Sequence, residues 1–124
     1  MERAREGIDE ARVLLEAGHR NTCVNRLYYA CFYAVSALLL TEGRASAKHA
    51  GVRALFDRHW VKTGRVPVKL GRVYRRLFMR RQRSDYGYFV QFSDDDVRAW
   101  LSEGDEFVTA IVEIVEHQLT KSTT

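Results

Sequence analysis

The sequence predicts an all-α protein, folded as an up-and-down bundle of about five helices. Apolar residues recur at three- and four-residue spacings through most of the chain, which is the period of helices that each bury one face. The 124 residues include one proline and eight glycines, a composition that favours long helices over a turn-rich β fold. The length fits one domain, which we expect to cover residues 1–120, with a frayed tail at 121–124.

The first two predicted helices differ in how much of their surface is apolar. The first has one apolar face and one charged face, and the apolar face contains Ile8, Ala11, Leu14, Leu15 and Gly18. The second, over residues 24–39, has an apolar stripe and further apolar side chains outside it. We therefore expect it to lie at the centre of the bundle or to face a partner. Gly43 is expected to end it.

The later helices are delimited by glycine, proline and serine. The third is expected over residues 46–63, with Gly64 ending it, and Pro67 suits the first position of the fourth. The aromatic segment 86–92 is interpreted as a packed loop. Ser93 then precedes three aspartates, so we expect it to cap a fifth helix whose first turn complements the helix dipole.

The fourth predicted helix is rich in arginine, and its arginines fall on different faces. Arg76, Arg80 and Arg83 lie in a row away from the apolar stripe, where they could contact the phosphates of a nucleotide or RNA. Arg81 instead continues the apolar face, and Asp85 follows it by one turn on the same line. Buried charges are costly unless they are paired, so Arg81 and Asp85 form either a structural ion pair or part of a functional site.

A lysine and a histidine are predicted to open the third helix. His49 is expected to face inward, where it could meet Arg81 and Asp85 and serve as an acid, a base or a phosphate ligand. The alternative is a histidine that is hydrogen-bonded within the fold. Lys48 would add a second cation beside it. Histidine, cysteine and carboxylate side chains show no spacing typical of a metal site, so we expect no metal and no cofactor.

The cysteines and the hydropathy bear on the cellular compartment. Cys23 and Cys31 lie about two turns apart on one predicted helix, too far to form a disulfide. We interpret both as core residues in a reducing compartment, which predicts a cytoplasmic protein. No run of about 20 apolar residues is evident, so we expect no membrane span. The net charge of +4 is compatible with a polyanionic partner.

Four segments of the chain resemble motifs of the HEPN-domain family of small stand-alone prokaryotic proteins. They are residues 25–34, 48–52, 61–64 and 81–86, and the last resembles the family's Arg-Gln-x-x-Asp-Tyr motif. The resemblance implies a four-helix-bundle-like fold that forms a homodimer. It also implies a minimal nucleotidyltransferase as a partner protein, often within a toxin–antitoxin module.

Three functions follow from these observations. The first is a binding module in which Arg81, Asp85, Tyr86, His49 and Lys48 bind a nucleotide or RNA, partnered by a nucleotidyltransferase. The second is a metal-independent ribonuclease toxin with an atypical site. Many HEPN proteins cut RNA with an arginine and a nearby histidine, but Asp85 and Tyr86 stand where that histidine is expected. Arg81 would then stabilise the transition state, and His49 or Tyr86 would transfer protons. The third is a purely structural dimerisation domain.

Overall fold

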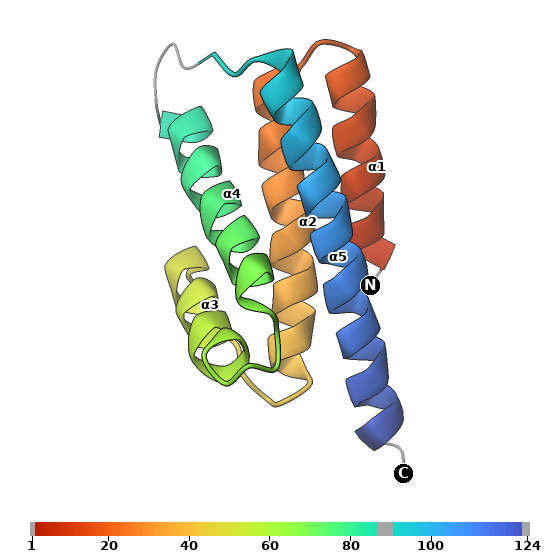
Figure 1. Cartoon of the computed structure of the whole chain (residues 1–124), viewed down its shortest axis with the longest axis vertical. Helices are drawn as coiled ribbons and strands as arrows, with labels where there is room; N and C mark the ends of the chain where they lie inside the picture. The colour runs from red at the N-terminus through yellow and green to blue at the C-terminus, as the bar shows by residue number, and fades with distance from the viewer. Residues whose placement is uncertain (1, 87–90, 123–124) are drawn as a thin grey trace.

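The protein is an all-α bundle, as the sequence predicts. The structure, a computed structural model, describes residues 2–86 and 91–122, with only the backbone described at 84–86 and 122. The helices are α1 (Glu2–Glu16), α2 (Arg20–Leu40), α3 (His49–Phe56), the π-helical η1 (Asp57–Val61), α4 (Val68–Tyr86) and α5 (Asp94–Ser122). Figure 1 shows the long helices α1, α2, α4 and α5 side by side, with the short α3 at one end next to α4.

Helix α2 is the central helix, because it packs against α1, α3, α4 and α5. Cys23 and Cys31 are free thiols in its buried surface, and burial raises the pKa of Cys23 to about 11. By length and composition α2 passes the test for a helix that could cross a membrane, which for a single helix is weak evidence, so the expectation of no membrane span stays a prediction. Of its most apolar window, 56% is buried inside the bundle, and the core helix of a soluble protein passes the same test.

Two glycines allow neighbouring helices to approach α2 closely. A Cβ atom added to Gly7 of α1 would lie 2.8 Å from the Cβ atom of Ala30. A Cβ atom added to Gly104 of α5 would collide with the side chain of Leu27, which is itself fully buried. The absence of side chains at these two positions therefore sets the separation of α1 and α5 from α2.

The third helix is shorter than predicted. It begins at His49 rather than at residue 46, because Ser46 Oγ accepts a hydrogen bond from the Lys48 N–H and forms a turn there. Beyond Phe56 the backbone becomes π-helical, and the Lys62 N–H bonds to the Asp57 carbonyl five residues back. Gly64 ends the segment with a φ of 79°, as expected for a glycine after a helix.

The boundaries of the last two helices also differ from the prediction. Pro67 precedes α4 rather than opening it, and its carbonyl accepts hydrogen bonds from the N–H groups of the first turn. Ser93 caps α5 as predicted, because its Oγ accepts a bond of 3.1 Å from the Asp96 N–H. The backbone of α5 runs through Lys121 and Ser122, the first two residues of the tail that was expected to fray, and residues 123–124 lie outside the described residues. Most of the predicted aromatic loop, residues 87–90, lies outside the described residues.

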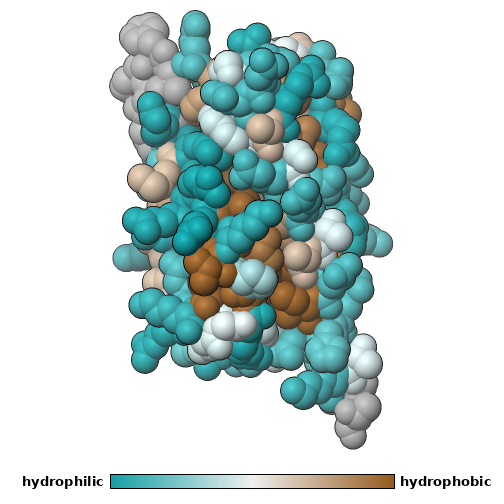
Figure 2. Space-filling model, viewed as in Figure 1, coloured by the Kyte–Doolittle hydropathy of each residue, from teal (hydrophilic) through white to brown (hydrophobic). Residues whose placement is uncertain are grey.

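The face of the molecule over α4 and α5 is mainly polar. Figure 2 shows it as largely hydrophilic, with its main apolar patch from the middle into the lower half. The core behind it is aromatic, and Tyr74 stacks on Phe107 of α5 with ring centroids 5.7 Å apart. These contacts hold α4 against α5 and fix where the inner face of α4 lies.

Candidate functional site

His49 opens α3 and packs onto the aromatic side chains of α2. Its Nδ1 atom shares a hydrogen bond of 2.9 Å with the Tyr28 hydroxyl. Its ring centroid lies 4.6 Å from that of Phe32 and 5.6 Å from that of Tyr29. Burial, followed by the charge of Arg81, lowers the pKa of His49 below its ordinary value. The imidazole is therefore neutral at neutral pH and held in one orientation.

Arg81 reaches the same pair of tyrosines from α4. Its Nη2 atom donates a hydrogen bond of 3.0 Å to the Tyr29 hydroxyl. The guanidinium carbon lies 5.5 Å from the centroid of the Tyr28 ring and 5.4 Å from that of Tyr29. The inward direction predicted for Arg81 is therefore confirmed, and the side chain is half-buried. We refer to Tyr28, Tyr29, His49 and Arg81 as the His49–Arg81 cluster.

The floor of the His49–Arg81 cluster is neutral. Tyr28 is fully buried and stacks on Tyr74, with ring centroids 6.0 Å apart. Burial raises the pKa of Tyr28 to about 12 and that of Tyr74 further still. Both hydroxyls therefore stay protonated at neutral pH, and Arg81 supplies the positive charge of the cluster.

The family can be settled by comparison with known proteins. Residues 1–115 match the HEPN domain family. The chain belongs to the HEPN family. It is 46% identical over 114 residues to a UPF0332 protein of Thermotoga maritima, a match that covers 92% of this chain and 86% of that protein.

Two further relatives of this HEPN domain come from Methanocaldococcus jannaschii, and both are named as toxins. "Putative toxin MJ0142" is 29% identical over 108 residues, which cover 87% of this chain and 74% of that protein. "Putative toxin MJ0605" is 35% identical over 86 residues, which cover 69% of this chain and 64% of that protein. The predicted membership of the HEPN family is thus confirmed.

Most of the remaining predicted site residues of this HEPN domain are either exposed or have side chains outside the described residues. Asp85 and Tyr86 belong to the last turn of α4, but their side chains lie outside the described residues. Lys48 is exposed directly before α3. Arg76 and Arg83 are exposed, as predicted for residues that contact phosphates. The structure therefore brings His49 and Arg81 together and leaves Lys48, Arg76 and Arg83 at the surface.

Arg80 differs from the exposed arginines near it. Its guanidinium carbon lies 4.0 Å from the centroid of the Trp100 ring on α5. The side chain is half-buried, and burial lowers its pKa. The prediction of a surface charge was therefore wrong for Arg80, which joins α4 to α5 by a cation–π contact. Trp100 sits at the edge of the apolar face of α5, and that position is the signal that sequence reasoning missed.

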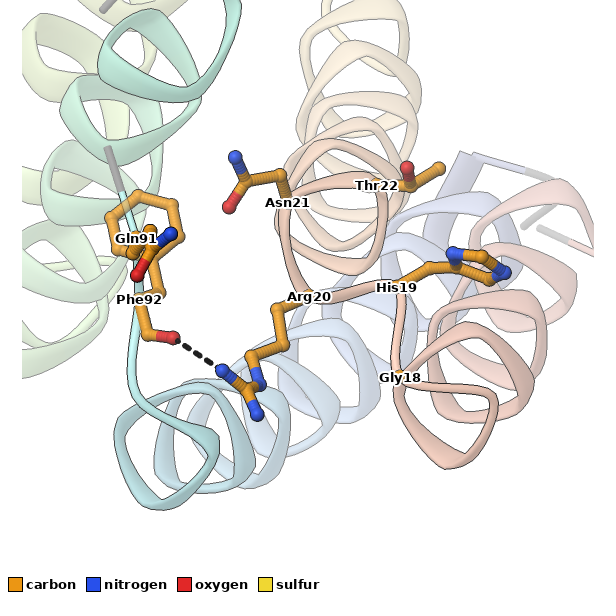
Figure 3. Close-up of a pocket in the computed structure, with 7 residues that line it drawn as sticks. All are labelled: Gly18, His19, Arg20, Asn21, Thr22, Gln91 and Phe92. Carbon is orange, nitrogen blue, oxygen red and sulfur yellow. Dashed lines mark hydrogen bonds between the residues drawn. The ribbon is translucent and has the colours of Figure 1, made fainter. Parts of the chain in front are cut away.

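A pocket at the junction of α1 and α2 contains none of the predicted site residues. It has a volume of about 370 Å³ and is lined by Gly18, His19, Arg20, Asn21, Thr22, Gln91 and Phe92. Figure 3 shows Arg20 reaching across it to the carbonyl oxygen of Phe92, at 3.4 Å. Within residues 2–86 and 91–122, no group of three or more histidine, cysteine or carboxylate side chains could hold a metal ion.

Proposed function

We propose that this HEPN domain is a toxin-like module that binds single-stranded RNA or a nucleotide and works with a nucleotidyltransferase. The observation that carries the proposal is the meeting of Arg81 and His49 on one pair of tyrosines. A guanidinium group presents a planar set of donors that suits phosphate oxygens. Tyr29 holds that group in place from α2.

The side chains around Arg81 suit the base of a nucleotide whose phosphate Arg81 binds. Tyr29 and Phe32 are half-buried, so part of each ring is accessible, and unpaired RNA bases commonly stack on such rings. His49 contributes a neutral ring with one nitrogen engaged by Tyr28. The exposed Arg76 and Arg83 add sequence-independent attraction for the phosphate backbone.

The biological setting is part of the same proposal. The two relatives named as toxins support a toxin-like role. The homodimer and the nucleotidyltransferase partner come from the family resemblance of the sequence. The buried free thiols of Cys23 and Cys31 suit the reducing cytoplasm, where we place the protein.

A metal-independent ribonuclease is the second candidate, and the state of His49 favours it. If Nδ1–H of the neutral imidazole donates to the Tyr28 hydroxyl, Nε2 can accept a proton from an attacking ribose hydroxyl. Arg81 would then stabilise the charge that develops on the phosphorus, and Tyr86 is the other candidate for proton transfer. Binding and cleavage would use the same arginine, so a single variant addresses both.

The experiment compares Arg81→Ala with Arg75→Ala, which removes an exposed arginine of α4 that is assigned no RNA contact. Each protein is titrated into fluorescein-labelled single-stranded RNA, and the same samples are run on a denaturing gel. We expect Arg81→Ala to weaken binding by about tenfold or more, because charged hydrogen bonds contribute roughly 1.5–3 kcal/mol. We expect a much smaller loss for Arg75→Ala.

The outcomes separate the three functions. If the wild type cleaves RNA and Arg81→Ala does not, the protein is a ribonuclease rather than a binding module. Equal affinities of Arg81→Ala and Arg75→Ala would contradict the assignment of the site to the His49–Arg81 cluster. If the wild type binds neither RNA nor mononucleotides, the structural dimerisation domain is the function that remains.

A further inference from the structure

Tyr29 connects the His49–Arg81 cluster to a pocket between α1 and α2. The pocket has a volume of about 260 Å³, close to the lower end of the range for small-molecule sites. Its lining includes Arg3, Glu6 and Gly7 from α1 and Arg26, Tyr29 and Tyr33 from α2. The Tyr29 hydroxyl accepts a hydrogen bond from Arg81, so one residue belongs to both the cluster and the pocket.

The pocket follows from helical spacing and from one missing side chain. Arg3 and Gly7 lie one turn apart on α1, as Tyr29 and Tyr33 do on α2, so large side chains flank the seam between the two helices. At the seam itself, Gly7 faces Ala30 so closely that an added Cβ atom would lie 2.8 Å from the Ala30 Cβ atom. The small residues form the floor, and the arginine and tyrosine side chains form the walls.

The walls of the pocket are flat and partly exposed. The guanidinium carbon of Arg3 lies 4.8 Å from the centroid of the Tyr33 ring. The centroids of Tyr29 and Tyr33 are 6.2 Å apart, and those of His49 and Tyr29 are 5.6 Å apart. Rings therefore follow one another from His49 through Tyr29 to Tyr33. A row of aromatic rings beside arginine side chains is the arrangement on which single-stranded nucleic acids stack successive bases.

The charges of the pocket favour a neutral ligand group. Arg3 and Arg26 are matched by Glu6 and Glu10, and Arg26 already pairs with Glu10 at 3.6 Å. A free phosphate would be attracted only weakly, because the negative charges of the two glutamates offset the positive charges of the two arginines. A nucleobase is flat and neutral, and its polar edge can bond to a carboxylate. Glu6 can only accept hydrogen bonds when ionised, so it favours a base whose exocyclic amino group offers N–H donors over uracil, whose base edge offers only the N3–H.

We propose that this pocket binds one unpaired, amino-bearing base of an RNA strand whose phosphate is held at the His49–Arg81 cluster. This inference rests on the proposed function. The base stacks on Tyr33 beside the Arg3 guanidinium, and Glu6 accepts a hydrogen bond from its amino group. Guanine, cytosine and adenine, which each carry an exocyclic amino group, are therefore preferred over uracil next to the contacted phosphate.

The test measures the affinity of fluorescein-labelled oligocytidine, oligoadenosine and oligouridine for four proteins: the wild type, Tyr33→Ala, Tyr33→Phe and Arg5→Ala. We expect Tyr33→Ala to weaken binding of oligocytidine by about 5-fold to 100-fold, which corresponds to the loss of one base stack. Tyr33→Phe keeps the ring and should bind within about twofold of the wild type. Arg5 is exposed on α1 and does not line this pocket, so Arg5→Ala controls for the loss of a positive charge.

A fifth protein, Glu6→Gln, tests the base preference. The wild type should bind oligocytidine and oligoadenosine more tightly than oligouridine, and Glu6→Gln should reduce that difference. Glu6 is exposed, so the substitution leaves the fold intact. Equal affinities of the wild type for all three strands would overturn the base preference.

Other outcomes distinguish this inference from the proposed function. If Tyr33→Ala binds as the wild type does while Arg81→Ala has lost affinity, the base pocket is wrong and the proposed function stands. If Tyr33→Phe is as weak as Tyr33→Ala, the ring does not stack on a base, and the inference is again overturned. If the wild type binds none of the strands, the base pocket is wrong, and the proposed function fails as well unless a mononucleotide binds. Circular dichroism of Tyr33→Ala and Tyr33→Phe checks that each variant is folded.

Discussion

The Tyr28 hydroxyl can be removed without changing the ring that carries it. Tyr28→Phe keeps the stack on Tyr74 and the contacts of the ring in the core, but it deletes the 2.9 Å hydrogen bond to His49. His49 Nδ1 then has to find water or remain unsatisfied. The substitution therefore measures how firmly α2 holds His49 at the start of α3.

The expected loss of stability can be worked out from these contacts. A hydrogen bond contributes about 0.5–1.5 kcal/mol net, and a buried group left without a partner costs about 1–3 kcal/mol. His49 is half-buried, so water can reach part of its ring. The range for the net contribution of a hydrogen bond therefore applies, rather than the range for a buried group without a partner. We expect Tyr28→Phe to lower the free energy of unfolding by about 0.5–1.5 kcal/mol.

Urea denaturation followed by circular dichroism provides the assay, and Tyr74→Phe is the matched control. The Tyr74 hydroxyl is also buried and lies near the Tyr28 hydroxyl, but it has no hydrogen bond of good geometry among the residues that the structure describes. Its removal should be neutral or slightly stabilising. With a urea m-value of about 2 kcal/mol/M, Tyr28→Phe should unfold roughly 0.5 M earlier than the wild type. Equal midpoints for the two variants would refute the reasoning.

Three further predictions concern acid stability, helix packing and capping. Because the folded-state pKa of His49 lies below 6.5, the unfolded chain binds more protons just below that pH, and stability falls on acidification. Urea midpoints at pH 7.5 and 5.5 should therefore drop less for His49→Gln than for the wild type, and equal drops would count against a buried neutral imidazole. Gly104→Ala should lower the free energy of unfolding by about 1–3 kcal/mol, because the new methyl group collides with Leu27; an unchanged urea midpoint would contradict this packing. Ser93→Ala should cost about 0.5–2 kcal/mol through loss of the cap on the Asp96 N–H, and a thermal midpoint equal to that of the wild type would contradict the cap.

Helical periodicity was enough to predict the fold and the inward position of Arg81, one of the two central residues of the candidate site. The spacing of apolar residues identifies the long helices because the same spacing decides which face is buried. It also places Arg81 inward, since Arg81 continues the stripe of Tyr74, Leu77 and Phe78, all of which are buried. A charged residue in such a stripe is conspicuous in a sequence, and here it contacts Tyr29.

Contacts between helices were harder to predict. They depend on how each helix is rotated and shifted relative to its neighbour, and the sequence of one helix does not determine this. Arg80 lies over Trp100 only because α4 and α5 meet at a particular offset. The π-helical turn of η1 inserts one residue relative to an α-helix, and its hydrogen bonds do not follow from residue type. Which tyrosine would pair with His49 likewise depends on how α3 docks onto α2.

The central claim is that RNA binds at the His49–Arg81 cluster, and the histidine ring signals in an NMR titration test it most directly. The chain has four histidines, and each gives its own imidazole signals in one sample. His117 is exposed near the end of α5 and is not part of the cluster, so it is an internal reference. As unlabelled single-stranded RNA is added, we expect the His49 signals to shift and saturate with the affinity measured by anisotropy, while those of His117 stay in place. Saturable RNA binding that leaves the His49 signals unmoved would contradict the claim.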